Sequence, residues 1–359
     1  MSLFSGKDEG LMGVDISATG IKLVELARSR TGFELKSMAI VPLPRDVIVE
    51  NTIIDSMAVS QALLDAVEAA RPSTRNVAFA VSGNAVIIKT IAMQTMTEFE
   101  LESQIRFEAD QHVPYDIDDV YLDFQILGKS RDSADEMDVV LVACKREVVE
   151  DFQLVFNEAG LQSMCVDCAV FALENAAELT DEHGLYGEAE EPSPEDAQVH
   201  ALVNIGAHLM NINVQINGQM SFVRDQFYGG HHLTEEIQKE HRISYQAAEQ
   251  MKLENFSGIG PDALERFYVG LTAELIRSLD FYAANHAEFP VQRILLSGGT
   301  ALVPGIAGEI EQRLGIETAV LQPFRNIKVK DRRFDADYLE RIGPMMTVPI
   351  GLALRGFDK

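Results

Sequence analysis

The stretch Gly13–Lys22, which reads GVDISATGIK, decides the fold of this 359-residue chain. It overlaps two apolar runs, Leu11–Ile16 and Ile21–Ala27, which predict two strands joined by a short polar turn. A carboxylate, Asp15, lies near the end of the first strand, and a cation, Lys22, begins the second. Backbone amides of small turn residues can approach phosphate oxygens, so the stretch predicts a phosphate-binding turn. An ordinary hairpin would have similar residues, so this turn does not define a site by itself.

The first strand and its turn occur twice in the chain. Val203–Ala207 (VNIGA) matches Val14–Ala18 (VDISA), and Asn204 stands 189 positions after Asp15. The second copy continues into a hairpin across Asn217-Gly218, the strongest short hairpin signal. An internal repeat of this length implies two similar domains that face each other. We therefore predict an α/β fold with two duplicated lobes.

Two further segments interrupt the repeat and predict insertions. In the first lobe, Thr97-x-x-Glu100 reads as a capping box that opens a helix ending near His112, between strand-like runs. In the second lobe, the insertion reads as mainly helical. The predicted domains are a first-lobe core (1–84 plus 161–198), an inserted α+β subdomain (85–160), a second-lobe core (199–228 plus 289–359) and a helical insertion (229–288).

The charge of the chain restricts its partners. Lys and Arg total 30 against 56 Asp and Glu, a formal net charge of −26. Such a surface repels nucleic acid and anionic lipid unless a basic patch exists, and no basic run is visible in the sequence. We therefore expect no nucleic-acid partner and no direct membrane insertion. Because Met1–Gly10 lacks an apolar signal-peptide core, we expect a cytoplasmic protein.

Three more elements extend the predicted phosphate site. Asn204–His208 supplies a matching turn from the second lobe, and the strand Leu295–Ser297 ends in a glycine pair whose backbone can lie against a purine or ribose. Ser244 opens a helix in which Glu249 and Lys252 share a face; a surface ion pair is the ordinary alternative. Asp15 could hold Mg²⁺ through water. The candidate nucleotide-binding residues are Asp15, Ser17, Ala18, Thr19, Lys22, Asn204, Gly206, Ala207, His208, Gly229, Gly230, Glu249, Lys252, Gly298, Gly299 and Thr300.

The order of these motifs is the pattern of the actin, Hsp70 and sugar-kinase superfamily. With Gly229-Gly230-x-x-x-Thr234 and the closing segment Thr347–Ala353, the chain resembles the type IV pilus assembly protein PilM family, in the branch that includes FtsA. The resemblance implies an actin-like, ribonuclease H-like fold that binds ATP and Mg²⁺. It also implies a location peripheral to the inner membrane, where the inserted subdomain docks the N-terminal cytoplasmic peptide of a PilN-like membrane protein. Contacts with pilus motor or platform proteins, and self-association, are compatible with it.

The sequence departs from the family pattern at Asn204, where an acidic residue is common, and at His208, where a small hydroxyl is common. A neutral amide cannot activate water as a base, so we predict no catalytic residue and little or no ATP hydrolysis by the protein alone. The same departure argues against a sugar-kinase-like ATPase, which needs a catalytic carboxylate. An FtsA-like membrane filament is a third alternative, but no amphipathic segment follows Leu354.

Overall fold

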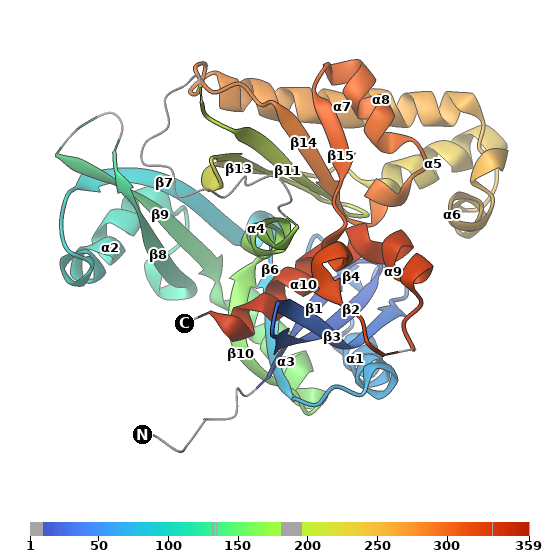
Figure 1. Ribbon diagram of the computed structural model, residues 1–359, viewed down its shortest axis with the longest axis horizontal. Helices are drawn as coiled ribbons and strands as arrows, with labels where there is room; N and C mark the ends of the chain where they lie inside the picture. The colour runs from blue at the N-terminus through green and yellow to red at the C-terminus, as the bar shows by residue number, and fades with distance from the viewer. Residues whose placement is uncertain (1–9, 131–132, 134, 181–195, 332, 359) are drawn as a thin grey trace.

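Each half of the chain folds around one mixed β-sheet (Figure 1). The five strands of the second sheet occupy the same places as five of the six strands of the first. The computed structural model describes residues 10–130, 133, 135–180, 196–331 and 333–358. The first sheet has the order β10-β6-β1-β2-β3-β16, and the second has the order β13-β12-β11-β14-β15. The strands of the first sheet are β1 (Leu11–Ser17), β2 (Gly20–Ser29), β3 (Gly32–Pro42), β6 (Asn76–Val81), β10 (Gln162–Cys168) and β16 (Ile327–Lys328). Those of the second are β11 (Val199–Ile205), β12 (Met210–Ile216), β13 (Gln219–Gln226), β14 (Arg293–Ser297) and β15 (Glu317–Val320).

The duplication extends to the register of the strands. β1 pairs with β2 so that Asp15 lies opposite Lys22, and β11 pairs with β12 so that Asn204 lies opposite Asn211. In each sheet the first three strands in chain order (β1, β2 and β3, or β11, β12 and β13) pair antiparallel, and the two strands added on the other side of β1 or β11 pair parallel. The turn between β12 and β13 has positive φ at both Asn217 and Gly218, as its sequence predicts. The predicted two-lobe repeat is therefore confirmed.

The inserted subdomain of the first lobe has a core of its own. Strands β7 (Val86–Gln94), β9 (Glu136–Lys145) and β8 (Val120–Lys129) form a separate sheet that packs against α2 (Glu98–His112). Thr97 and Glu100 form the predicted capping box at the start of α2. Helix α3 (Arg146–Glu158), by contrast, buries its apolar face in the core of the first lobe. We therefore propose that the subdomain ends near Lys145 and not at residue 160.

The remaining helices cover the faces of the two main sheets. In the first lobe, α1 (Ser56–Ala70) shares one core with α3 and the sheet, beside the short hairpin β4 (Ile48–Val49) and β5 (Thr52–Ile53). In the second lobe, α5 (Gly230–His241), α6 (Tyr245–Glu254), α7 (Pro261–Ala283) and α8 (Ile306–Leu314) share a single core with their sheet. Among the described residues, no helix combines the length and the apolar character needed to cross a bilayer.

The C-terminal segment returns to the first lobe, so we propose that the second-lobe core ends near Val320 and not at residue 359. β16 pairs with β3, and α9 (Ala336–Ile342) and α10 (Thr347–Leu354) pack with the apolar face of β2 and β3. In Figure 1 this red segment lies over the blue strands. The sequence repeat cannot reveal this crossing, because an apolar helix fits either sheet equally well.

Helices α4 (Ala169–Leu179) and α10 pack against each other where the lobes meet. A Cβ on Gly351 of α10 would lie 1.7 Å from the carbonyl oxygen of Ala172, and one on Gly13 would lie 2.0 Å from that of Pro349. These approaches are closer than any side chain allows. Because these two glycines have no side chain, α10 can pack this closely between α4 and β1.

Candidate functional site

The first-lobe part of the predicted site is an ion pair at the end of the β1–β2 hairpin. Lys22 Nζ lies 2.6 Å from Asp15 Oδ2 and donates a second hydrogen bond of 3.1 Å to Ser17 Oγ. Ser17 Oγ in turn donates to the Gly20 carbonyl across the turn. Lys22 is only 8% exposed, so its charge is fixed in place by these two partners. Ala18 and Thr19 form the tip of the turn.

The second-lobe turn is held by backbone contacts. The carbonyl of Gly206 accepts from the Gly230 amide at 3.0 Å and from Thr300 Oγ1 at 2.7 Å. The carbonyl of Ala207 accepts from the amide of His231, and Gly229 lies directly against the same two carbonyl groups. The turn is thereby joined to the start of α5 and to the residues after β14.

Helix α6 contributes a cation that organises this region. Lys252 Nζ donates to Glu249 Oε2 at 2.7 Å, to Thr234 Oγ1 at 2.8 Å and to the Gly230 carbonyl at 3.2 Å. Burial lowers the pKa of Lys252, although the carboxylate of Glu249 opposes that effect. The predicted pairing of Glu249 with Lys252 is present, but it belongs to a network that reaches the glycines at the start of α5. It is more than a surface ion pair.

The glycine pair after β14 has two different roles. Gly298 has φ +89, and a Cβ there would lie 2.4 Å from the carbonyl oxygen of Ile205, so only glycine fits. At Gly299, by contrast, no atom lies within 4 Å of where a Cβ would stand. Gly298 therefore packs the strand ends together, and Gly299 faces open space beside them.

A chain of polar side chains runs from these strand ends to the first lobe, and sequence reasoning missed it. Ser297 Oγ donates to Asn204 Oδ1, Asn204 Nδ2 donates to Asn211 Oδ1 at 3.0 Å, and Asn211 Nδ2 donates to Asp225 Oδ1 at 2.7 Å. The other oxygen of Asp225 accepts from the amide of Gly83, at the base of the inserted subdomain, at 2.8 Å. Burial raises the pKa of Asp225, although both hydrogen bonds oppose that shift. Only the repeat, which places Asn211 at the position of Lys22, could have indicated this chain.

A row of rings forms a second link between the lobes. His208 lies 4.0 Å from the ring of His231, whose Nδ1 is 2.6 Å from the hydroxyl of Tyr245. The guanidinium of Arg45, from the first lobe, lies 4.2 Å from the centre of the Tyr245 ring. Burial lowers the pKa of His231 to about 4, with His208 acting in the same direction, so His231 is neutral at neutral pH. No motif in the sequence singles out Arg45.

The structure thus gathers the predicted residues into two groups. Asp15, Ser17 and Lys22 form one, and the residues around Gly206 and Lys252 form the other; among the residues described, no hydrogen bond joins the two groups directly. Two surface hollows of the fold lie elsewhere. The nucleotide assignment therefore depends on residue chemistry and not on an enclosed cavity. The described part of the chain has no cluster of three His, Cys, Asp or Glu side chains suited to a metal ion.

Two sheets with matching strand arrangements, joined where α4 and α10 pack together, define the class of actin-like ATPase folds. The ethanolamine utilization protein EutJ from Carboxydothermus hydrogenoformans has this fold at a TM-score of 0.58 and 16% identity, over 96% of this chain and 88% of that one. MreB5 of Spiroplasma citri, solved with AMPPNP, matches at 0.52 and 13%, over 96% and 95%.

The chain belongs to the family described as type IV pilus assembly protein PilM, whose model matches residues 13–357. It is similar to a chain of the solved PilM–PilN type IV pilus biogenesis complex, with a TM-score of 0.84 and 28% identity. The match covers 98% of this chain and 99% of that one. The predicted family and fold class are therefore confirmed, and the chain is a type IV pilus assembly protein.

Proposed function

We propose that this protein is an ATP-binding scaffold of the type IV pilus assembly platform. In this proposal it binds ATP and Mg²⁺ between its lobes and docks the N-terminal peptide of a PilN-like membrane protein at the cytoplasmic face of the inner membrane. The family match and the PilM–PilN complex support the partner, and the AMPPNP complex of MreB5 supports the ligand. The single observation that carries the proposal is that equivalent strands of the two lobes both end in a polar turn, with the Asp15–Lys22 ion pair in one lobe and the Gly206–Gly230–Thr300 contacts in the other.

The described residues fit a nucleotide with its phosphates between the lobes. Lys22 places a positive charge beside the first turn, and the open space at Gly299 leaves room for a ligand beside the second. In this proposal the carboxylate of Glu249, which accepts from Lys252, also accepts from ribose hydroxyls. Mg²⁺ keeps several waters and is commonly held by one or two carboxylates together with phosphate oxygens, so Asp15 is sufficient to hold it through water. The ion would screen the phosphate charge there.

Asn204 supports binding without appreciable turnover. Its Oδ1 accepts from Ser297 and its Nδ2 donates to Asn211, so both ends of this neutral amide are engaged by the protein. It cannot take a proton from water. Phosphate release from the purified protein at ordinary enzyme rates, about 1–10³ per second, would contradict this part of the proposal.

The inserted subdomain offers surfaces for a partner peptide. Phe99 and Phe107 of α2 are 80% and 74% exposed. At the base of the subdomain, the ammonium of Lys145 lies 4.7 Å from the ring centre of Tyr115, whose hydroxyl donates to the Asn84 carbonyl. Exposed aromatic side chains beside fixed cations are typical of peptide-binding surfaces. We place the docking site along α2 and the base of the inserted subdomain.

Calorimetric titration of the full chain with Mg·ATP tests the nucleotide site. Replacing Gly299 with Leu fills the open space without a clash in the fold, so we expect ATP affinity to fall at least about tenfold. Gly308→Leu is the matched control, since a Cβ at Gly308 also meets nothing within 4 Å, and it should bind ATP normally. Equal affinity of the two variants would rule out the proposed site. A parallel titration with the PilN-like peptide tests the partner separately.

A further inference from the structure

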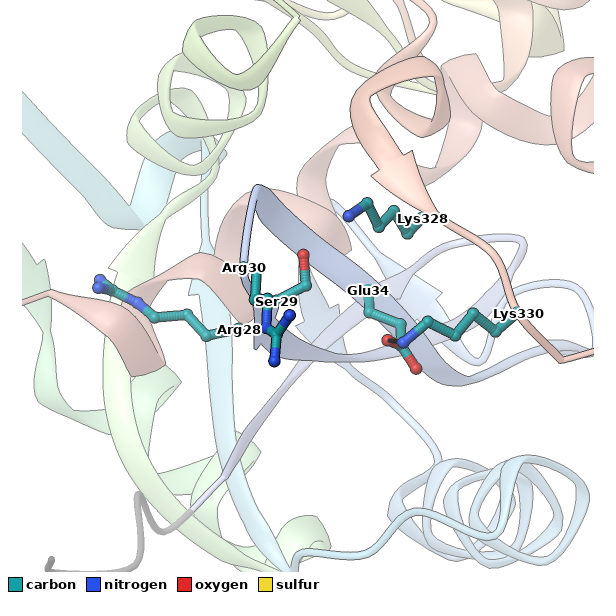
Figure 2. Close-up of a pocket in the computed structure, with 6 residues that line it drawn as sticks. All are labelled: Arg28, Ser29, Arg30, Glu34, Lys328 and Lys330. Atoms are coloured by element: carbon teal, nitrogen blue, oxygen red, sulfur yellow. Dashed lines mark hydrogen bonds and ion pairs between the residues drawn. The ribbon is translucent and has the colours of Figure 1, made fainter.

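A basic hollow lies at the edge of the first sheet, away from the proposed nucleotide site. Its volume is about 530 Å³, and it opens between the tip of the β2–β3 hairpin and the chain around β16 (Figure 2). The residues that line it are Arg28, Ser29, Arg30, Glu34, Lys328 and Lys330. Four of these six carry positive charge and one is acidic, although the whole chain carries −26.

This patch is not visible in the sequence, because the two segments that form it lie about 300 positions apart. Arg28 and Arg30 belong to the hairpin, whereas Lys328 and Lys330 belong to the segment that returns from the second lobe. β16 pairs parallel with β3, which places Lys328 opposite Glu34. The return of the C-terminal segment to the first lobe therefore builds the hollow.

Some of these cations are engaged by other groups of the protein, and others are not. Glu34, whose side chain is mostly buried, accepts from both Lys330 and Lys36, and these hydrogen bonds lower its pKa. Arg28 donates to the Phe357 carbonyl, and in Figure 2 its side chain extends away toward that C-terminal turn.

Arg30 and Lys328 are exposed and have no carboxylate partner within the described ranges. Figure 2 shows the Lys328 ammonium directed toward the hairpin tip. The two available cations thus line one hollow from opposite segments. Their charges are not neutralised by the protein itself, unlike that of Lys330.

We propose that this basic hollow is a docking site for an extended acidic peptide segment of a partner protein. Arg30 and Lys328 line the hollow from two separate segments of the fold, and no carboxylate of the described residues neutralises either charge. An extended peptide that carries several carboxylates has the complementary charge and can reach both cations. The volume lies in the range of peptide and small-ligand sites, about 300–1,000 Å³.

An anionic bilayer is a poorer occupant than a peptide. A flat surface would meet more than the hollow of a chain whose net charge is −26, and each cation near such a surface contributes only about 1 kcal/mol. A short acidic segment can contact the hollow alone. The proposal does not depend on nucleotide binding.

Fluorescence anisotropy with two labelled decapeptides, alternating Ser-Glu and alternating Ser-Gln, tests the site on the full chain. We expect the wild-type protein to bind the Ser-Glu peptide at low salt, to release it near 1 M salt, where the Debye length is about 3 Å, and not to bind Ser-Gln. Arg30→Glu with Lys328→Glu should weaken binding about tenfold or more. Lys129→Glu with Arg341→Glu changes the net charge equally at two other exposed cations and should stay within about twofold.

Several outcomes would overturn the proposal. These are no binding of the Ser-Glu peptide by the wild type, equal loss in both double variants, or hollow-dependent binding of phosphatidylglycerol vesicles or inorganic phosphate without peptide binding. Thermal melts establish that the charge-reversed protein is folded. Arg30→Gln with Lys328→Gln, which removes charge without adding repulsion, should give an intermediate loss.

Discussion

Asp15 and Lys22 face each other across β1 and β2, and 189 positions later Asn204 and Asn211 face each other across β11 and β12. The first pair is an ion pair of 2.6 Å, and the second is an amide–amide hydrogen bond of 3.0 Å. The same backbone geometry thus carries charge in one lobe and none in the other. The asymmetry leaves Lys22 as the cation beside the first-lobe turn, with a neutral amide in the second lobe at the position that matches Asp15.

Replacing Lys22 with Met should affect stability and ligand binding separately. The variant leaves the Asp15 carboxylate without its partner, so we expect a loss of about 1–3 kcal/mol in the free energy of unfolding and weaker ATP binding. Adding Asp15→Asn should restore most of the stability, because an amide is less costly to leave unpaired, but it should not restore ATP binding. Denaturant melts and calorimetry measure the two quantities. Full recovery of ATP affinity in the double variant would contradict a role for Lys22 in phosphate binding.

At the scale of single elements, α10 decides how the lobes join. It is apolar around its whole surface and is buried between α4 and β1, with Gly351 allowing the approach to the Ala172 carbonyl. A helix that is apolar on all sides is read from sequence as buried, but not as buried against any particular neighbour. For that reason the sequence pattern alone placed this segment in the second lobe.

Gly351→Ala should be strongly destabilising, since the new methyl group would lie 1.7 Å from a backbone oxygen that cannot move alone. We expect a loss of at least about 2 kcal/mol in the free energy of unfolding, measured by chemical denaturation. Gly308→Ala in α8, where the added group meets nothing within 4 Å, serves as the control and should be neutral or slightly stabilising. Similar stability of the two variants would show that α10 packs less closely than described.

Across the whole molecule, buried carboxylates mark the places where the lobes touch. Asp225 accepts from the Gly83 amide, and Glu174 of α4 accepts from Asn213 of β12 at 2.5 Å. Because Asp225 lies at the base of the inserted subdomain and is linked through Asn211 to the nucleotide-side strand ends, it is suited to couple the two sites. Any such coupling must be reciprocal.

The coupling predicts that Mg·ATP changes the affinity of the PilN-like peptide, by about 5–150-fold if it is typical of allosteric proteins. Asp225→Ala should reduce that change while leaving peptide affinity without nucleotide nearly unaltered. Calorimetric titration with the peptide, with and without Mg·ATP, measures both values. If the wild-type protein binds the peptide equally well with and without Mg·ATP, the coupling is ruled out, but neither binding site is.

The same carboxylates predict a pH dependence of stability. Burial raises the pKa of Asp225 above 3.8 and that of Glu174 above 4.5, so folding favours their protonated forms. The free energy of unfolding therefore falls as pH rises from the ordinary pKa values of these two groups to their raised pKa values. Asp225→Asn with Glu174→Gln removes both titrations, so the stability of the variant relative to the wild type should rise as pH increases through this window, measured by chemical denaturation at several pH values. A difference that does not change with pH would contradict this.

The sequence by itself determined the duplicated sheets, because strand periodicity, the Asn217-Gly218 turn and the 189-residue repeat are local patterns that each lobe can satisfy alone. It also indicated the capping box of α2 and the pairing of Asp15 with Lys22, while the phosphate-binding role of the two turns stays a prediction. Only the tertiary structure decided that the C-terminal segment returns to the first lobe, that Asp225 reaches Gly83 and that Arg45 covers Tyr245. It also gathered Arg30 and Lys328 into one hollow. These contacts join residues that are far apart in the chain. Periodicity and spacing are local patterns, so they do not indicate which surfaces of the two lobes pack together.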